Sequence, residues 1–300
     1  MKSTKTFVYG VLIGLLGIVM FSSKAVMVKL AYNYEVDSIS VLLLRMLFAF
    51  PFYVAILIWN RKQKTTLPLE PRDYYWLVGF GVIGYYSSSY FDFVGLSYIK
   101  ASLERIILFL YPTMVLIFNK LFLKQPISKV QAGAILLTYL GVLLAFGDEV
   151  SISGSDTYIG GIFILLSAVT YAAYLVGSGW LIPKFGVTKF TSYAMVVSCI
   201  CVFIHFLIVN EADIFGLPRQ VYVLGFLIAI IATVIPSFLV SKSISMINSS
   251  NFAIVAGAGP ISTIILAGIF LGEVLTWLQL FGALVVIAGI VIVSVRKGAD

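Results

Sequence analysis

The chain has 300 residues, of which 61% are hydrophobic and 11% charged, with a formal net charge of +7 and a mean hydropathy of +1.06. A soluble domain of this composition would expose far more apolar surface than water tolerates, so the composition indicates a polytopic membrane protein. The 20 basic residues stand singly between apolar runs and form no stripe that could follow a phosphate backbone, which excludes a nucleic-acid partner.

Ten apolar runs approach the length of about 20 residues that one bilayer crossing needs. In chain order they lie near residues 7–31, 39–59, 75–97, 101–118, 129–146, 158–181, 189–209, 220–240, 251–270 and 275–295. The first run follows Lys2 and Lys5 as a signal peptide would, but it is too long for a signal peptide and is interpreted as an uncleaved span. We therefore expect an all-α integral membrane protein with ten transmembrane helices.

The loops between these runs differ in charge, and Lys and Arg are retained on the cytoplasmic side of a membrane. If the N-terminus lies inside, nearly all loop Lys and Arg residues are cytoplasmic, and the opposite loops hold only Lys100 and Arg219. This distribution predicts a multi-pass protein with both termini in the cytoplasm.

An internal repeat divides the chain. A shift of 148 positions, the interval from Pro112 to Pro260, also aligns Phe122-Leu123 with Phe270-Leu271 and Gly141 with Gly289. We expect a first five-helix repeat over residues 1–146, a polar linker over 147–157, and a second repeat over 158–300. Because each repeat has an odd number of spans, the second must lie inverted relative to the first, as in many secondary transporters.

Four stretches resemble the EamA family of the drug/metabolite transporter superfamily: FSSKAVMVKLAYN, LLLRMLF, GLSYIKASLERIILFLYPT and GPISTIILAGIFLGE. The resemblance covers essentially the whole chain. It implies a ten-helix bundle with a central cavity that works by alternating access, most often as an exporter in a bacterial cytoplasmic membrane. The chain departs from the usual pattern at Lys24, where the family has an uncharged residue, so no relative's substrate is carried over.

Five charged residues lie three or more positions inside the predicted spans, all in the first half: Lys24, Arg45, Asp92, Glu104 and Arg105. A charge in the hydrocarbon region is costly unless it is paired or hydrated, so each is a candidate for substrate binding or coupling. Together they carry one excess positive charge, which favours a carboxylate or a zwitterion. Structural roles remain open: a salt bridge of Lys24 or Arg45 with a carboxylate, a helix-dipole role for Glu104, and snorkelling for Arg105.

Polar side chains on two helices extend this candidate site. The third span has polar side chains at positions i, i+3, i+4 and i+7, which lie on one face of a helix and suit a cavity wall. They are Tyr85, Ser88, Ser89 and Asp92. Hydrogen bonding between helices is the alternative explanation. Asp92 is the best candidate for a protonatable coupling group, since burial can raise the pKa of a carboxyl. Tyr171 and Tyr174 share a face of the sixth span and are candidates for the opposite wall.

These features favour a secondary transporter of small metabolites such as amino acids or related zwitterionic or anionic solutes, with protons as a candidate coupling ion. The chain has no Walker lysine motif, so we expect no direct use of ATP. Because it has only two cysteines and one histidine, we also expect no metal site, no cofactor and no enzymatic activity. The alternatives are a membrane-embedded enzyme acting on a lipid-borne substrate and a facilitative carrier without ion coupling. The expected partners are the solute and membrane lipid, for a monomer or a homodimer.

Overall fold

The computed structural model describes residues 4–60, 68–99, 101–146, 155–209, 214–271 and 277–296. In these ranges the chain forms helices joined by short turns and no strand, which confirms the all-α class. The first half contains α1 (Thr4–Tyr32), α2 (Ser38–Trp59), α3 (Pro71–Phe80), the π-helix η1 (Gly81–Ser87), α4 (Ser88–Tyr98), α5 (Ala101–Leu108), α6 (Tyr111–Leu123) and α7 (Lys129–Phe146). The second half contains α8 (Ser155–Phe185), α9 (Val187–Val209), α10 (Arg219–Ala229), the π-helix η3 (Ile230–Val234), α11 (Ile235–Val255), α12 (Ala258–Leu271) and α13 (Trp277–Arg296).

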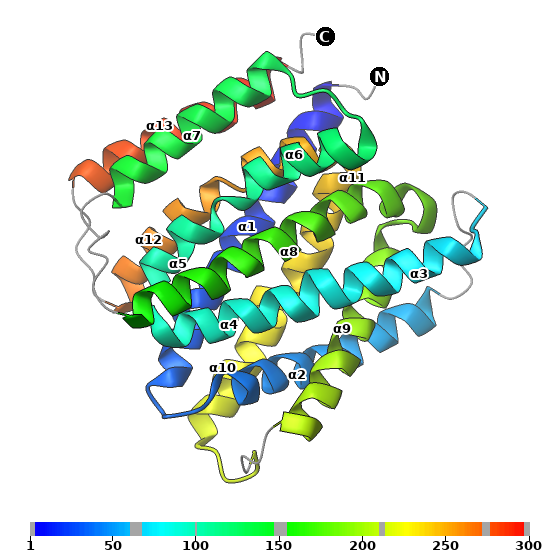
Figure 1. Ribbon diagram of the computed structural model, residues 1–300, viewed down its shortest axis with the longest axis vertical. Helices are drawn as coiled ribbons and strands as arrows, with labels where there is room; N and C mark the ends of the chain where they lie inside the picture. The colour runs from blue at the N-terminus through cyan, green and yellow to red at the C-terminus, as the bar shows by residue number, and fades with distance from the viewer. Residues whose placement is uncertain are drawn as a thin grey trace.

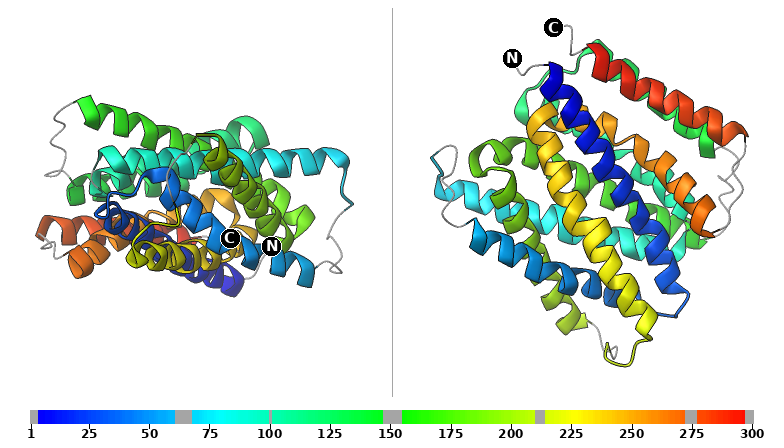
Figure 2. Two further views of the ribbon diagram at one scale, coloured as in Figure 1. Left: turned by 90° about the horizontal axis from the view of Figure 1, so that it is seen from below. Right: turned by 180° about the vertical axis from the view of Figure 1, so that it is seen from behind.

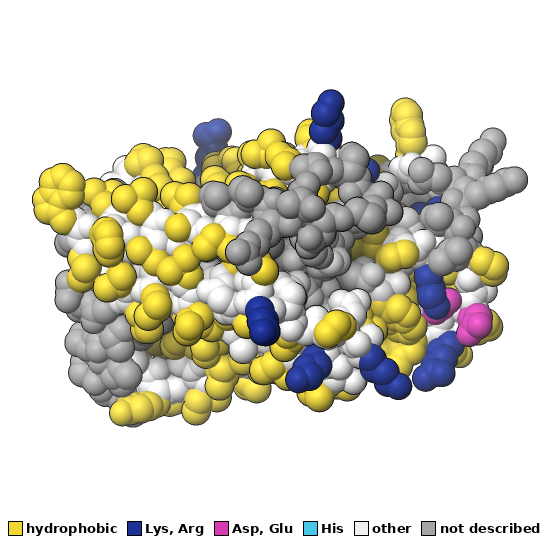
Figure 3. All heavy atoms as spheres, turned by 90° about the horizontal axis from the view of Figure 1, so that it is seen from above, with side chains coloured by type: hydrophobic (Ala, Val, Ile, Leu, Met, Phe, Trp, Pro, Cys, Tyr) yellow, Lys and Arg dark blue, Asp and Glu magenta, His cyan; other side chains and the backbone are white. Residues whose placement is uncertain are grey.

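Several helical stretches suit a bilayer. Among the described residues, five are long and apolar enough to cross one, namely 5–32, 38–59, 157–185, 187–209 and 219–255. Large apolar side chains such as Leu136, Leu207 and Phe281 are exposed on the outside of the bundle, and apolar side chains cover much of the face in Figure 3. The protein is therefore a multi-pass membrane protein, whereas the number of ten spans stays a prediction.

The two halves are related by an approximate two-fold arrangement (Figure 1). The last helices of the halves, α7 and α13, lie side by side. They run in opposite directions, because Gly141 approaches Gly282 whereas Thr138 approaches Gly289. The packing of α1 on α11 has its counterpart in the packing of α8 on α4, and α2 packs on its equivalent, α9. This arrangement confirms the inverted repeats.

The same interruptions occur in both halves. The π-helices η1 and η3 occupy equivalent positions, and turns at residues 109–110 and 256–257 precede Pro112 and Pro260. The predicted fourth span is therefore not one helix but α5 and α6, and the predicted ninth span begins inside α11. Proline favours both breaks, because it lacks a backbone N–H and fits the first turn of a helix better than its interior.

The boundary between the halves lies partly outside the described residues. Residues 147–154 of the predicted linker are not among them, and α8 begins at Ser155, three residues before the predicted start of the second repeat. The repeat boundaries stay a prediction.

Close packing of α1 on α11 positions the first half of α1 (Figure 2). A Cβ atom on Gly14 would lie 2.6 Å from Oγ of Ser243, so only glycine permits this approach. The Ser243 hydroxyl also donates to the carbonyl oxygen of Gly10 at 2.8 Å. The next part of α1, which carries Lys24, is thereby held against the centre of the bundle.

Candidate functional site

A small cavity of about 80 Å³ lies in the bundle between α1, α2, η1, α4, α5, α8 and the start of α12. One water molecule needs roughly 10–15 Å³, so the cavity has room for several. Eight of the ten predicted site residues line it: Lys24, Arg45, Tyr85, Ser88, Ser89, Asp92, Arg105 and Tyr171. Glu104 and Tyr174 do not line the cavity and lie directly behind its wall.

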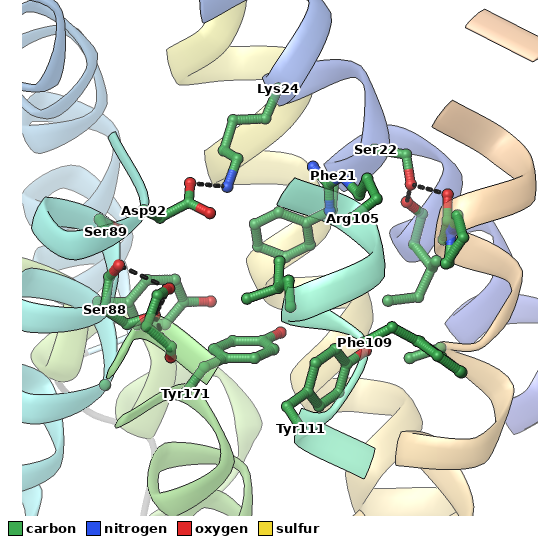
Figure 4. A pocket seen from close by; sticks show the side chains of 18 of the residues that line it. Phe21, Ser22, Lys24, Ser88, Ser89, Asp92, Arg105, Phe109, Tyr111 and Tyr171 are labelled. Atoms are coloured by element: carbon green, nitrogen blue, oxygen red, sulfur yellow. Dashed lines mark hydrogen bonds and ion pairs between the residues drawn. The ribbon is translucent and has the colours of Figure 1, made fainter. Parts of the chain in front are cut away.

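Four of the five predicted charges form one ion-pair cluster at this wall. The Lys24 ammonium pairs with Asp92 and lies 3.9 Å from Oε1 of Glu104. On the other side of Glu104, Nε of Arg105 is 3.0 Å from Oε2. The four side chains are at most 11% exposed, and Figure 4 shows Lys24 and Asp92 pointing toward each other. Mutual pairing offsets the cost of burying them.

Arg45 borders the same cavity but is not part of this cluster. Its Nε donates to Oγ1 of Thr233 at 2.7 Å, and its Nη1 donates to Oγ of Ser89 at 3.1 Å. The guanidinium also lies over the ring of Phe93. Within the described ranges no carboxylate is in ion-pair contact with it, although the residue is only 2% exposed. The sequence left open a salt bridge of either Lys24 or Arg45 with a carboxylate. In the structure Lys24 forms this salt bridge, with Asp92, and Arg45 does not.

Aromatic rings form the wall opposite the charges. Tyr171 packs edge-on against Tyr111 with ring centroids 5.2 Å apart, and Tyr174 packs against Tyr85 at 4.7 Å. Figure 4 shows the rings of Tyr171 and Tyr111 on the side of the cavity away from Lys24. A solute in this cavity would contact charges on one side and aromatic faces on the other.

Several polar residues at the site were not predicted from the sequence. The clearest is Ser167 of α8, whose hydroxyl lies 3.1 Å from that of Ser88 on α4. Its spacing of i, i+4 and i+7 with Tyr171 and Tyr174 is the helical pattern that would have identified it. Thr233, which accepts from Arg45, was also missed, because it comes from a π-helix in the other half of the chain.

Comparisons with known proteins identify the family. The model of the EamA-like transporter family matches residues 8–147 and again residues 158–295. The chain belongs to the EamA-like transporter family. Among its EamA-like relatives, the uncharacterized transporter YcbK of Bacillus subtilis is 33% identical over 91% of this chain and 88% of its own length. The uncharacterized transporter sll1319 of Synechocystis is 25% identical over 96% and 94%.

A solved crystal structure has the same fold as this EamA-like chain. It superposes with a TM-score of 0.78 at 12% identity and covers 99% of this chain and 100% of its own. The described parts of the EamA-like bundle hold no group of three or more His, Cys, Asp or Glu side chains placed to bind a metal ion. The chemistry on the cavity wall is therefore that of ion pairs, hydroxyl groups and aromatic faces.

Proposed function

We propose that this protein is a secondary transporter that exports small zwitterionic or anionic metabolites by alternating access. The observation that supports this proposal is Arg45, a buried guanidinium that borders the cavity and pairs with hydroxyl groups instead of a carboxylate. Lys24, Asp92, Glu104 and Arg105 together carry no net charge, so Arg45 supplies the one excess positive charge at the cavity. A solute carboxylate is the natural partner for a guanidinium, which presents several donors in one plane.

The inverted repeats support alternating access. Inverted repeats provide two equivalent packings of the halves, one open to each side of the membrane. The cavity is lined by helices of both halves, so a movement of one half against the other would change access to it. The family membership supports transport itself, while solute class and direction are the proposal.

Protons are the proposed coupling ion if transport is driven against a gradient. Asp92 is the proposed carrier, because it borders the cavity while its partner Lys24 is shared with a second carboxylate, Glu104. Protonation of Asp92 would release Lys24 to pair with Glu104 alone.

The test is flux into liposomes that contain the purified protein. A pool of amino acids, carboxylates and organic cations is offered with and without a pH gradient, and the accumulated solutes are resolved by mass. We expect uptake of carboxylate-bearing solutes, and Arg45→Ala should weaken their binding by about 10-fold to 100-fold, the range expected for a hydrogen bond to a charged group. Arg45→Lys should recover part of the loss, and Arg72→Ala, at an exposed arginine, is the matched control.

Two results would contradict the proposal. If no solute in the pool is transported, with or without the pH gradient, the proposed transporter function is wrong. If uptake is confined to organic cations and is unaffected by Arg45→Ala, the proposed solute class is wrong. Comparison of right-side-out and everted vesicles then assigns the direction.

A further inference from the structure

The Lys24 side chain occupies a position that a free cation could otherwise take. Its ammonium group pairs with Asp92 and lies 3.9 Å from Oε1 of Glu104, and all three side chains are buried in or directly behind the cavity wall. Secondary transporters bind coupling cations at buried oxygen ligands near interrupted helices. Here the two carboxylates come from successive helices, Asp92 from α4 and Glu104 from α5, and α5 ends after two turns at the break before Pro112.

The carboxyl groups around Lys24 are buried and have few neutral donors. The contacts of Asp92 and Glu104 are ion pairs with Lys24 and Arg105 and a contact between the two carboxyl groups themselves. The side chains of Asp92 and Glu104 are 2% and 0% exposed, respectively. Carboxylate oxygens at this depth are costly unless a positive charge stays beside them.

The charge balance shows what Lys24 contributes. Asp92 and Glu104 supply two negative charges, and Lys24 and Arg105 supply two positive ones. Arg105 pairs with Glu104 on the side away from Lys24, so Asp92 depends on Lys24 for its ion pair. Loss of the Lys24 ammonium would leave one uncompensated negative charge beside the cavity and vacate the position next to the two carboxylates.

We infer that Lys24 is a tethered cation that replaces a bound alkali-metal ion in this transporter. The native protein then needs no sodium ion, and removal of the ammonium creates a sodium or lithium site at Asp92 and Glu104. Carboxylate oxygens are suitable ligands for such hard cations. The consequence for flux rests on the proposed function, but creation of the cation site does not.

The test is the thermal stability of the purified full-length protein in sodium, lithium or choline chloride at equal ionic strength. Wild type should melt at the same temperature in all three salts. Lys24→Met should melt roughly 3 °C higher in sodium than in choline, at a sodium concentration about ten times its dissociation constant. The shift should saturate with sodium, because it reports binding at one site.

Three controls assign the effect to the Lys24 ammonium. Lys24→Arg keeps a tethered cation and should remain insensitive to sodium. Lys29→Met removes another lysine of α1, one that donates to the carbonyl oxygen of Leu96 at 2.6 Å, and should also remain insensitive. Lys24→Met combined with Glu104→Gln removes the surplus negative charge and should lose the sodium response.

A chemical rescue covers the case in which Lys24→Met does not fold. Lys24→Cys, made with Cys199 and Cys201 replaced by alanine, should respond to sodium until an aminoethyl thiosulfonate attaches an ammonium group to the new cysteine. Sodium stabilisation of wild type, or Lys24→Met and Lys24→Cys proteins indifferent to sodium, would overturn the inference. Because this measurement needs no solute, a protein without flux whose Lys24→Met variant binds sodium would contradict the proposed function alone.

Discussion

At the scale of single residues, Arg45 and Lys24 carry the same charge at the same cavity in different environments. The Lys24 ammonium is shared by two carboxylates, so its charge is neutralised by the protein. The Arg45 guanidinium contacts two hydroxyl groups and an aromatic ring, so its charge remains available to a ligand. A buried charge that the protein leaves uncompensated is the more informative of the two for substrate class.

The pair of Glu104 and Arg105 should behave as a unit in unfolding experiments. Removal of one partner of a buried ion pair leaves the other unpaired, at a cost of about 3 kcal/mol or more, whereas removal of both costs less. We expect Glu104→Gln and Arg105→Met to destabilise the protein strongly as single changes and far less than additively when combined. Thermal unfolding of the four proteins in one detergent measures the coupling, and additive effects would show that the 3.0 Å contact contributes nothing.

At the scale of elements, the interruptions in the helices place the site. The cavity draws residues from η1, from the turn between α5 and α6, and from the turn between α11 and α12. A further interruption lies inside α11 at Asn248, whose backbone angles of φ 64° and ψ 167° belong to a region that almost only glycine adopts. The Asn248 side chain compensates in part, because its Oδ1 accepts the backbone N–H of Asn251 at 3.0 Å.

Substitutions at Asn248 should separate backbone strain from capping. Asn248→Ala keeps the strained backbone and loses the side-chain cap, so the free energy of unfolding should fall by about 1–2 kcal/mol. Asn248→Gly also loses the cap but relieves the strain, so its stability should lie close to that of wild type. Melting temperatures of the two variants provide the measurement, and a glycine variant less stable than the alanine variant would show that the cap alone matters.

At the scale of the whole molecule, both described ends of the chain lie on the same side of the bundle. The start of α1 and the end of α13 lie near each other in Figure 1, as an even number of crossings requires. Many of the loop charges that predict which side this is, among them Lys62 and Lys100, lie outside the described residues. The cytoplasmic location of the termini and the bacterial inner membrane therefore stay predictions from charge and family.

Reporter fusions test this orientation directly. A fluorescent protein fused after Asp300 should be bright, because it folds in the cytoplasm, and alkaline phosphatase fused at the same point should be inactive. The same reporters placed after Val209, in the loop that follows α9, should behave in the opposite way. A bright fluorescent fusion at both points would contradict the predicted topology.

The sequence by itself determined the membrane class, the two repeats, the family and most of the polar side chains that line the cavity. Apolar length, repeated spacing and a charge inside an apolar run are properties of neighbouring residues, so they can be read without coordinates. Tertiary structure alone decided the partner of each charge: Asp92 for Lys24, 68 positions away, and the Thr233 hydroxyl for Arg45, 188 positions away. Such pairs depend on the rotation and tilt of separate helices, and on interruptions such as η1 and η3 that no local pattern predicts. Ser167 shows both sides of this division, because its helical spacing with Tyr171 and Tyr174 could be read from the sequence, whereas its partner Ser88 on another helix could not.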